Sequence, residues 1–94
     1  MEITGKFIRY YDIVEGEKNG KQWLKTSFTI MTTDGHSRMV GFTVFGSDKV
    51  AIVQMLNPGD TVSVQFYPES REFNDKIYTE LNMVKVMVAK PIAA

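Results

Sequence analysis

Apolar and polar residues alternate along four stretches of the chain, a pattern typical of strands with one buried face. The stretches are 22–32, 38–45, 61–67 and 76–86. We expect the apolar parity of each stretch to face a core. The residues expected to point inward are Leu24, Phe28, Ile30, Val40, Phe42, Val44, Val62, Val64, Phe66, Ile77, Leu81 and Met83.

The stretch 2–14 is also rich in strand-forming residues, but its alternation changes phase. Ile3 and Phe7 share a parity, whereas the neighbouring Ile8 is also apolar. A glycine inside a strand often marks a bulge or a bend. We therefore interpret Gly5 as a bend that lets both ends of one long strand face the core.

Turn signals separate these stretches. They are Asn19-Gly20 and Asp34-Gly35, which favour hairpins, Pro58-Gly59, which favours a turn, and Asn74-Asp75, which tolerates a tight one.

One segment, 47–57, carries apolar residues at helical spacing instead of alternating ones. The spacing predicts a helix of about two to three turns, with Ser47 or Asp48 as its N-terminal cap. Its inward residues are expected to be Val50, Val53 and either Met55 or Leu56.

The order of elements predicts the fold. Long bent strand, strand, strand, short helix, strand, strand is the order of an OB-fold, a five-stranded Greek-key barrel with one short helix between strands 3 and 4. We expect an all-β protein with a single domain over 1–94, whose last few residues are frayed. An SH3-like barrel is the structural rival, but it would not place its helix there.

The composition narrows the function classes. The chain has 94 residues, no cysteine and a single histidine, His36, so a thiolate metal site is excluded and no second ligand stands at metal spacing. No phosphate-binding glycine loop or nucleophile motif is present, and we expect neither an enzyme nor a cofactor. No apolar run is long enough to span a bilayer and the N-terminus lacks a signal-peptide core, so we expect a cytoplasmic protein with no membrane partner.

Several segments resemble bacterial single-stranded DNA-binding proteins. The segments are "MEITGKFI", "KNGKQWLKTSFTI", "FTVFGSDKV" and "NPGDTVSVQFYPESREFNDKIYTEL". They look even more similar to small uncharacterised OB-fold proteins common in Bacteroidetes. The resemblance covers nearly the whole chain and implies binding of single-stranded DNA, with RNA as an alternative, by a homo-oligomer, either a dimer or a tetramer.

The chain also departs from that family. Met39 stands near the place where the family's third strand commonly carries an aromatic, so one stacking platform is lost. The long linker and acidic C-terminal tip that recruit partners are absent, and we expect a bare binding module. The second departure puts a role as a hub in DNA replication, repair or recombination in doubt.

Aromatic side chains interleaved with cations are the chemistry that single strands require, because bases stack on rings and phosphates pair with Lys or Arg. The outward parity and the last hairpin supply such residues. The candidate nucleic-acid-binding residues are Lys21, Trp23, Lys25, Phe45, Tyr67, Arg71, Phe73, Lys76 and Tyr78.

Other interpretations of these residues stay open. Trp23 could cover an edge of the core, Phe45 could pack under the helix, and most of the lysines could be ordinary surface charge. Tyr67 and Phe73 could form an oligomer interface, where exposed aromatics are also enriched. Eleven basic residues balance eleven acidic ones, which favours the alternative function of a protein-interaction or assembly domain that does not bind nucleic acid.

Overall fold

The computed structural model describes residues 1–33 and 35–89, in which six strands and one helix form. The elements are β1 (Glu2–Tyr10), β2 (Val14–Lys18), β3 (Lys21–Thr32), β4 (Met39–Phe45), α1 (Ser47–Gln54), β5 (Thr61–Phe73) and β6 (Lys76–Val88).

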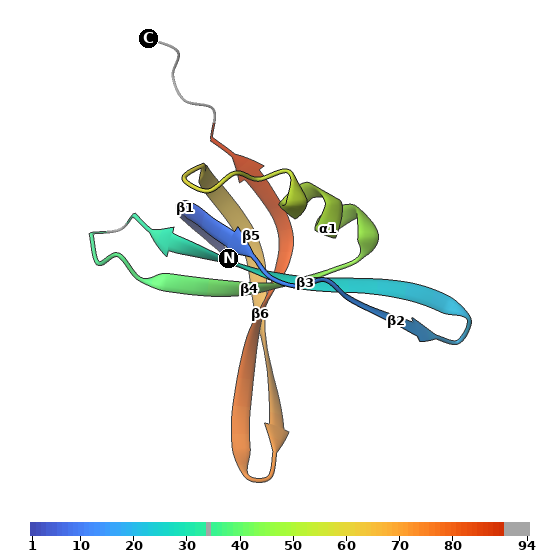
Figure 1. Cartoon of the computed structure of the whole chain (residues 1–94). Helices are drawn as coiled ribbons and strands as arrows, with labels where there is room; N and C mark the ends of the chain where they lie inside the picture. The colour runs from blue at the N-terminus through green and yellow to red at the C-terminus, as the bar shows by residue number, and fades with distance from the viewer. Residues whose placement is uncertain (34, 90–94) are drawn as a thin grey trace.

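The strands form one sheet in the order β1-β5-β6-β4-β3-β2, and an additional β1–β3 pairing closes five of them into a barrel. The pairs are antiparallel except β4 with β6, which run parallel. Helix α1 connects β4 to β5 and packs against β3, β4 and β6 (Figure 1). The predicted OB-fold barrel, with its helix between the third and fourth barrel strands, is confirmed.

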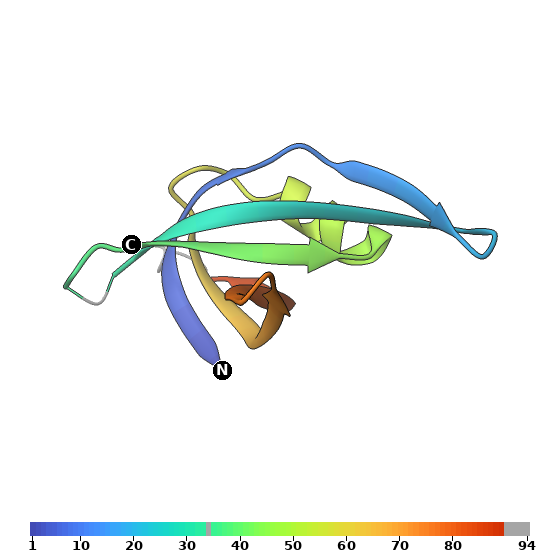
Figure 2. The same cartoon turned by 90° about the horizontal axis from the view of Figure 1, so that it is seen from below.

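Two hairpins extend beyond the barrel as arms (Figure 1). The first arm is the β2–β3 hairpin and the second is the outer half of the β5–β6 hairpin. Seen from below, the first arm continues the long, gently curved β3 to one side of the molecule (Figure 2). These arms account for the elongated shape, with principal extents of 51 × 32 × 20 Å.

Strand β1 passes from one neighbour to another at Gly5. Its first half pairs with β5 and its second half with β3, and Gly5 itself is paired with Val62 on one side and Thr32 on the other. A Cβ atom at this position would lie 2.6 Å from the carbonyl oxygen of Met31. The backbones of β1 and β3 therefore meet too closely at Gly5 for a side chain. The irregularity in β1 lies elsewhere than predicted, because its register shift falls between Phe7 and Arg9, at the out-of-phase Ile8, and the strand ends at Tyr10 rather than Val14.

The core lies inside the barrel and under α1. Its buried apolar residues are Phe7, Phe28, Ile30, Phe42, Val44, Val50, Val53, Leu56, Val62, Val64 and Met83. Of the residues predicted to point inward, Leu24, Val40, Phe66 and Leu81 are partly buried and pack against this core. The prediction for Ile77 is wrong, because this residue is 74% exposed. Ile77 has the same parity as the inward-facing residues of β6. It lies in the outer half of the hairpin, however, where there is no barrel core to cover it.

The sheet has one strand more than predicted. Residues 14–18 read "VEGEK" and show no clear apolar alternation, yet they form β2 and pair with the first five residues of β3. The turn that joins the two strands is the predicted Asn19-Gly20, with φ angles of 54° and 77°. Residues 21–24 of β3 extend beyond its register with β4, and this short polar strand is the strand that pairs with them.

Helix α1 begins differently from the prediction. Gly46, with φ 110°, is the N-cap residue, and no side chain caps the helix. The expected capping by Ser47 or Asp48 is therefore wrong, and the Val50 amide donates to the Gly46 carbonyl at 2.9 Å. Leu56 rather than Met55 is buried at the far end.

The remaining turn predictions are met where the structure describes them. Gly59 takes φ 93°, and Asn74 and Asp75 both have positive φ. In the predicted Asp34-Gly35 turn, Gly35 has φ 91°, whereas residue 34 lies outside those described, as do residues 90–94, for which fraying was expected.

Candidate nucleic-acid interface

Strand register places predicted site residues on the same outer side of the barrel. Lys25 on β3 is paired with Phe45 on β4. Two residues before Phe45, Thr43 is paired with Asn82 on β6, which in turn is paired with Tyr67 on β5. Because paired residues, and residues two apart in a strand, point to the same side of a sheet, Lys25, Phe45 and Tyr67 share one side across four strands.

The β5–β6 arm continues this side. Arg71 is paired with Tyr78 and Phe73 with Lys76, at even spacing from Tyr67. All three rings on the arm are exposed, Tyr67 by 51%, Phe73 by 66% and Tyr78 by 54%. The arm therefore presents three rings and two cations to solvent in one row.

We call this side the aromatic face. Its members are the nine predicted site residues Lys21, Trp23, Lys25, Phe45, Tyr67, Arg71, Phe73, Lys76 and Tyr78. Lys21 and Trp23 belong to it because they share the parity of Lys25 along β3.

Trp23 and Phe45 form a stacked pair on this face. Their ring centroids lie 5.8 Å apart, with an angle of 23° between the planes. Trp23 is partly buried, whereas Phe45 is 57% exposed. Trp23 is not among the partly buried residues that pack against the core; it is covered by Phe45 and β2 instead, and Phe45 offers the more accessible ring.

Acidic groups interrupt the aromatic face. Arg71 pairs with Glu69 at 3.6 Å, and both side chains are exposed. Glu69 is paired across the hairpin with Glu80, so two carboxylates share this side with Arg71. An exposed ion pair contributes only about 0–1 kcal/mol, so a phosphate could displace Glu69 from Arg71.

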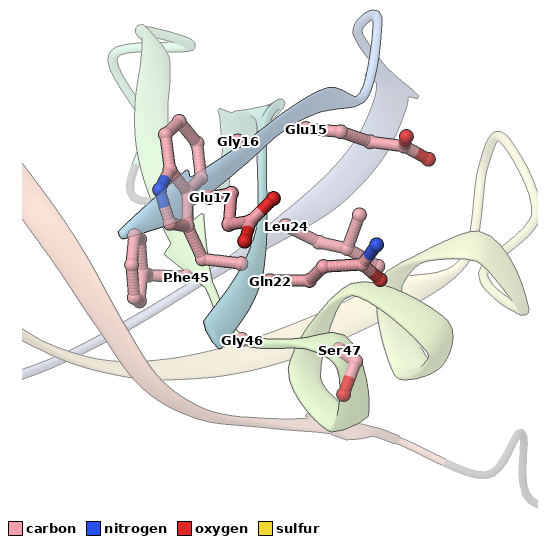
Figure 3. Close-up of a pocket in the computed structure, with 9 residues that line it drawn as sticks. Glu15, Gly16, Glu17, Gln22, Leu24, Phe45, Gly46 and Ser47 are labelled. Atoms are coloured by element: carbon pink, nitrogen blue, oxygen red, sulfur yellow. The ribbon is translucent and has the colours of Figure 1, made fainter. Parts of the chain in front are cut away.

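A pocket of about 750 Å³ lies beside the first arm, between β2, β3 and the start of α1. Glu15, Glu17, Gln22 and Leu24 come from the opposite parity of the arm, while Trp23 and Phe45 also contribute to the lining. Figure 3 shows Phe45 on one side of the arm and Gln22 and Ser47 on the other. The sequence pattern did not predict this pocket, because its acidic wall depends on β2, a strand that the pattern did not predict either.

In residues 1–33 and 35–89, no three His, Cys, Asp or Glu side chains gather in a way that could hold a metal ion. No helix within the same ranges has the length and apolar character needed to cross a membrane.

The ring of strands and its single helix define an OB-fold barrel of the kind found in single-stranded DNA-binding proteins. The chain belongs to the family described as Domain of unknown function (DUF3127), whose model matches residues 2–87. No curated protein matches the sequence.

Solved structures with the same fold include the mitochondrial single-stranded DNA-binding protein Rim1 of S. cerevisiae. It is 18% identical, with a TM-score of 0.70 over 96% of this chain and 94% of Rim1. The small single-stranded DNA-binding protein of Streptomyces coelicolor is 14% identical, with a TM-score of 0.52 over 95% of this chain and 92% of that protein. At these identities the likeness shows a shared fold.

Proposed function

We propose that this protein binds single-stranded DNA with little sequence preference, by stacking bases on the aromatic face. The observation that supports the proposal is the strand register, in which Phe45, Tyr67 and Phe73 share the outward parity of neighbouring strands. Base stacking on an aromatic ring contributes about 1–3 kcal/mol per base and is tolerant of sequence. Two or three such rings are enough for useful affinity.

The cations of the same face are assigned to the phosphates. Lys25 lies in the cross-strand position beside Phe45, and Lys76 lies beside Phe73. This alternation of ring and cation fits a single strand, in which bases and phosphates project in different directions. Lys21 extends the row toward the tip of the first arm, and Arg71 joins it when Glu69 is displaced.

The fold supports DNA as the ligand, since both solved structures described above are single-stranded DNA-binding proteins. RNA is the alternative ligand. Titrating oligo-U of the same length as the oligo-dT separates the two ligands. The role assigned is binding without catalysis.

The proposal is tested by titrating fluorescein-labelled oligo-dT with the protein at low salt and following anisotropy. We expect saturable binding in the micromolar range or tighter. Phe73→Ala should weaken it roughly fivefold or more, consistent with the loss of one stack. Ile77→Ala is the matched control, because Ile77 is 74% exposed, against 66% for Phe73, and lies on the opposite side of the same hairpin. Absence of binding at tens of micromolar protein would contradict the proposal.

We also propose that the chain forms a homo-oligomer, a dimer or a tetramer. Apolar side chains remain exposed on α1, at its C-cap and on β6, among them Ile52, Met55 and Met87. Burying such side chains in an interface is favourable, at about 25 cal/mol per Å² of apolar surface removed from water. Light scattering over a range of protein concentrations measures the mass, and a monomer at all concentrations would contradict this part of the proposal.

The second candidate function is a protein-interaction domain, and the pocket beside the first arm favours it. Glu15 and Glu17 line that pocket, and carboxylates repel a phosphate backbone while attracting basic side chains. If this function holds in place of DNA binding, the oligo-dT titration shows no saturation, and Phe73→Ala has no effect on it.

A further inference from the structure

Gly16 on β2 is the cross-strand partner of Trp23, and the indole lies directly over it. A Cβ atom built on Gly16 would overlap Cζ2 and Cε2 of the indole and lie 2.8 Å from Cη2. These atoms belong to the six-membered part of the ring. The indole therefore occupies the space that any other residue at position 16 would need for its side chain.

The steric clash that a Cβ atom would meet at Gly16 differs in kind from the clash at Gly5, and Gly41 has no clash. At Gly5 the nearest atom is a backbone oxygen, which cannot move without disturbing the barrel, whereas at Gly16 it is the far end of a side chain. Gly41 has ordinary space, with its nearest neighbour, Thr29 Cγ2, at 3.8 Å. A methyl group at position 16 would thus displace the indole and leave the barrel intact.

Displacing the indole changes the aromatic face, because Trp23 is stacked with Phe45. Phe45 is the more exposed ring of the pair and Trp23 the more covered one. The partly buried indole restricts where the Phe45 ring can lie, and a fixed ring loses less conformational entropy when a base stacks on it.

We propose that Gly16 is a positioning residue for single-strand binding, which holds Trp23 flat on β2 so that Trp23 supports Phe45 as the base-stacking platform. This inference rests on the proposed function. In this account Trp23 supports Phe45 rather than stacking on a base itself. The first arm, a polar hairpin outside the core, contributes to DNA binding by positioning Trp23.

The test is a double-mutant cycle read by oligo-dT anisotropy. Gly16→Ala should weaken binding roughly three- to tenfold in the wild-type background, up to the contribution of one stacked base. In a Trp23→Ala background the same change should alter affinity less than about twofold, because no ring then occupies the space over position 16. Gly41→Ala, a glycine-to-alanine change with free space, is the matched control and should bind like wild type.

An equal loss from Gly16→Ala in both backgrounds, or no loss in either, would overturn the inference. Circular dichroism of Gly16→Ala should retain the barrel signal. An unfolded Gly16→Ala variant would also overturn it, because the glycine would then be needed for folding rather than for placing the ring.

A second readout separates this inference from the proposed function. Trp23 is the only tryptophan, so its fluorescence reports on this ring alone. In DNA-free protein, Gly16→Ala should increase quenching of Trp23 by acrylamide, whereas Gly41→Ala should not. If wild type fails to bind oligo-dT, the proposed function fails, and the quenching result still decides whether Gly16 holds the indole.

Discussion

Phe28 and Phe45 lie on neighbouring strands of the barrel but in opposite environments. Phe28 is completely buried, with its ring 5.1 Å from that of Phe42 and 5.9 Å from that of Phe7. Phe45 is 57% exposed and contacts Trp23 at the surface. The same side chain therefore supports folding at one position and is available for a ligand at the other.

Truncating the Phe28 ring should reduce stability, whereas truncating the Phe45 ring should reduce DNA affinity. Phe28→Ala leaves a cavity in the core and should lower the free energy of unfolding by about 3–5 kcal/mol. Phe45→Ala should change the free energy of unfolding by less than about 1 kcal/mol, because the Phe45 ring is already largely exposed in the folded protein. The same change should weaken oligo-dT binding. Denaturant unfolding of both variants measures the difference. Equal destabilisation by the two changes would show that Phe45 is a core residue.

Alternation along a strand was sufficient to predict which side Phe28 and Phe45 face, because side chains in a strand have a period of two. It could not predict that Trp23 is partly covered. That cover comes from Gly16 on β2 and from Phe45 on β4, and both depend on the register between strands. Likewise, the ion pair of Arg71 with Glu69 follows from the side-chain conformation of two exposed residues, which no pattern fixes.

At the scale of elements, the barrel and its two arms follow different rules. Barrel strands have an apolar parity that packs on the core, and all of these strands were predicted. The arms are held by cross-strand hydrogen bonds and by turns with positive φ, at Asn19-Gly20 and Asn74-Asp75. Because β2 has no apolar parity, the sequence pattern did not predict it. Because the second arm has no core to pack on, the apolar parity of Ile77 led to a wrong prediction that it is buried.

Gly5 links the two halves of β1, and its replacement tests how the barrel closes. Gly5→Ala brings a methyl group against the Met31 carbonyl, so it should lower the free energy of unfolding by about 1–3 kcal/mol, as overpacking does. Gly41→Ala, which has space on the outer side, should stay within about 0.5 kcal/mol of wild type. Thermal unfolding measures both, and a Gly5→Ala variant as stable as wild type would contradict the close approach of β1 to β3.

For the whole molecule, the balance of charge indicates how much electrostatic attraction contributes to DNA affinity. Eleven cations and eleven anions give a formal net charge of zero, so long-range attraction of a polyanion is weak. The aromatic face has four cations, Lys21, Lys25, Arg71 and Lys76, and the carboxylates of Glu69 and Glu80 lie beside it on the same side of the second arm. Stacking, rather than phosphate neutralisation, must then supply most of the affinity.

Salt dependence measures that balance. Each phosphate neutralised on a single strand contributes about −0.7 to the slope of log affinity against log salt concentration. With four cations at most, the slope should be no steeper than about −3. Oligo-dT affinities over a series of salt concentrations provide the slope, and a much steeper one would show that cations outside the aromatic face bind the DNA.

Base stacking is tested most directly by comparing oligo-dT with an abasic oligomer of the same length and charge, using anisotropy at low salt. Stacking on Phe45, Tyr67 and Phe73 predicts saturable binding of oligo-dT and binding of the abasic strand weaker by about tenfold or more, since each lost stack is worth about 1–3 kcal/mol. Equal affinity for the two strands would show that the rings do not contact bases, and the aromatic face would then not be the binding site.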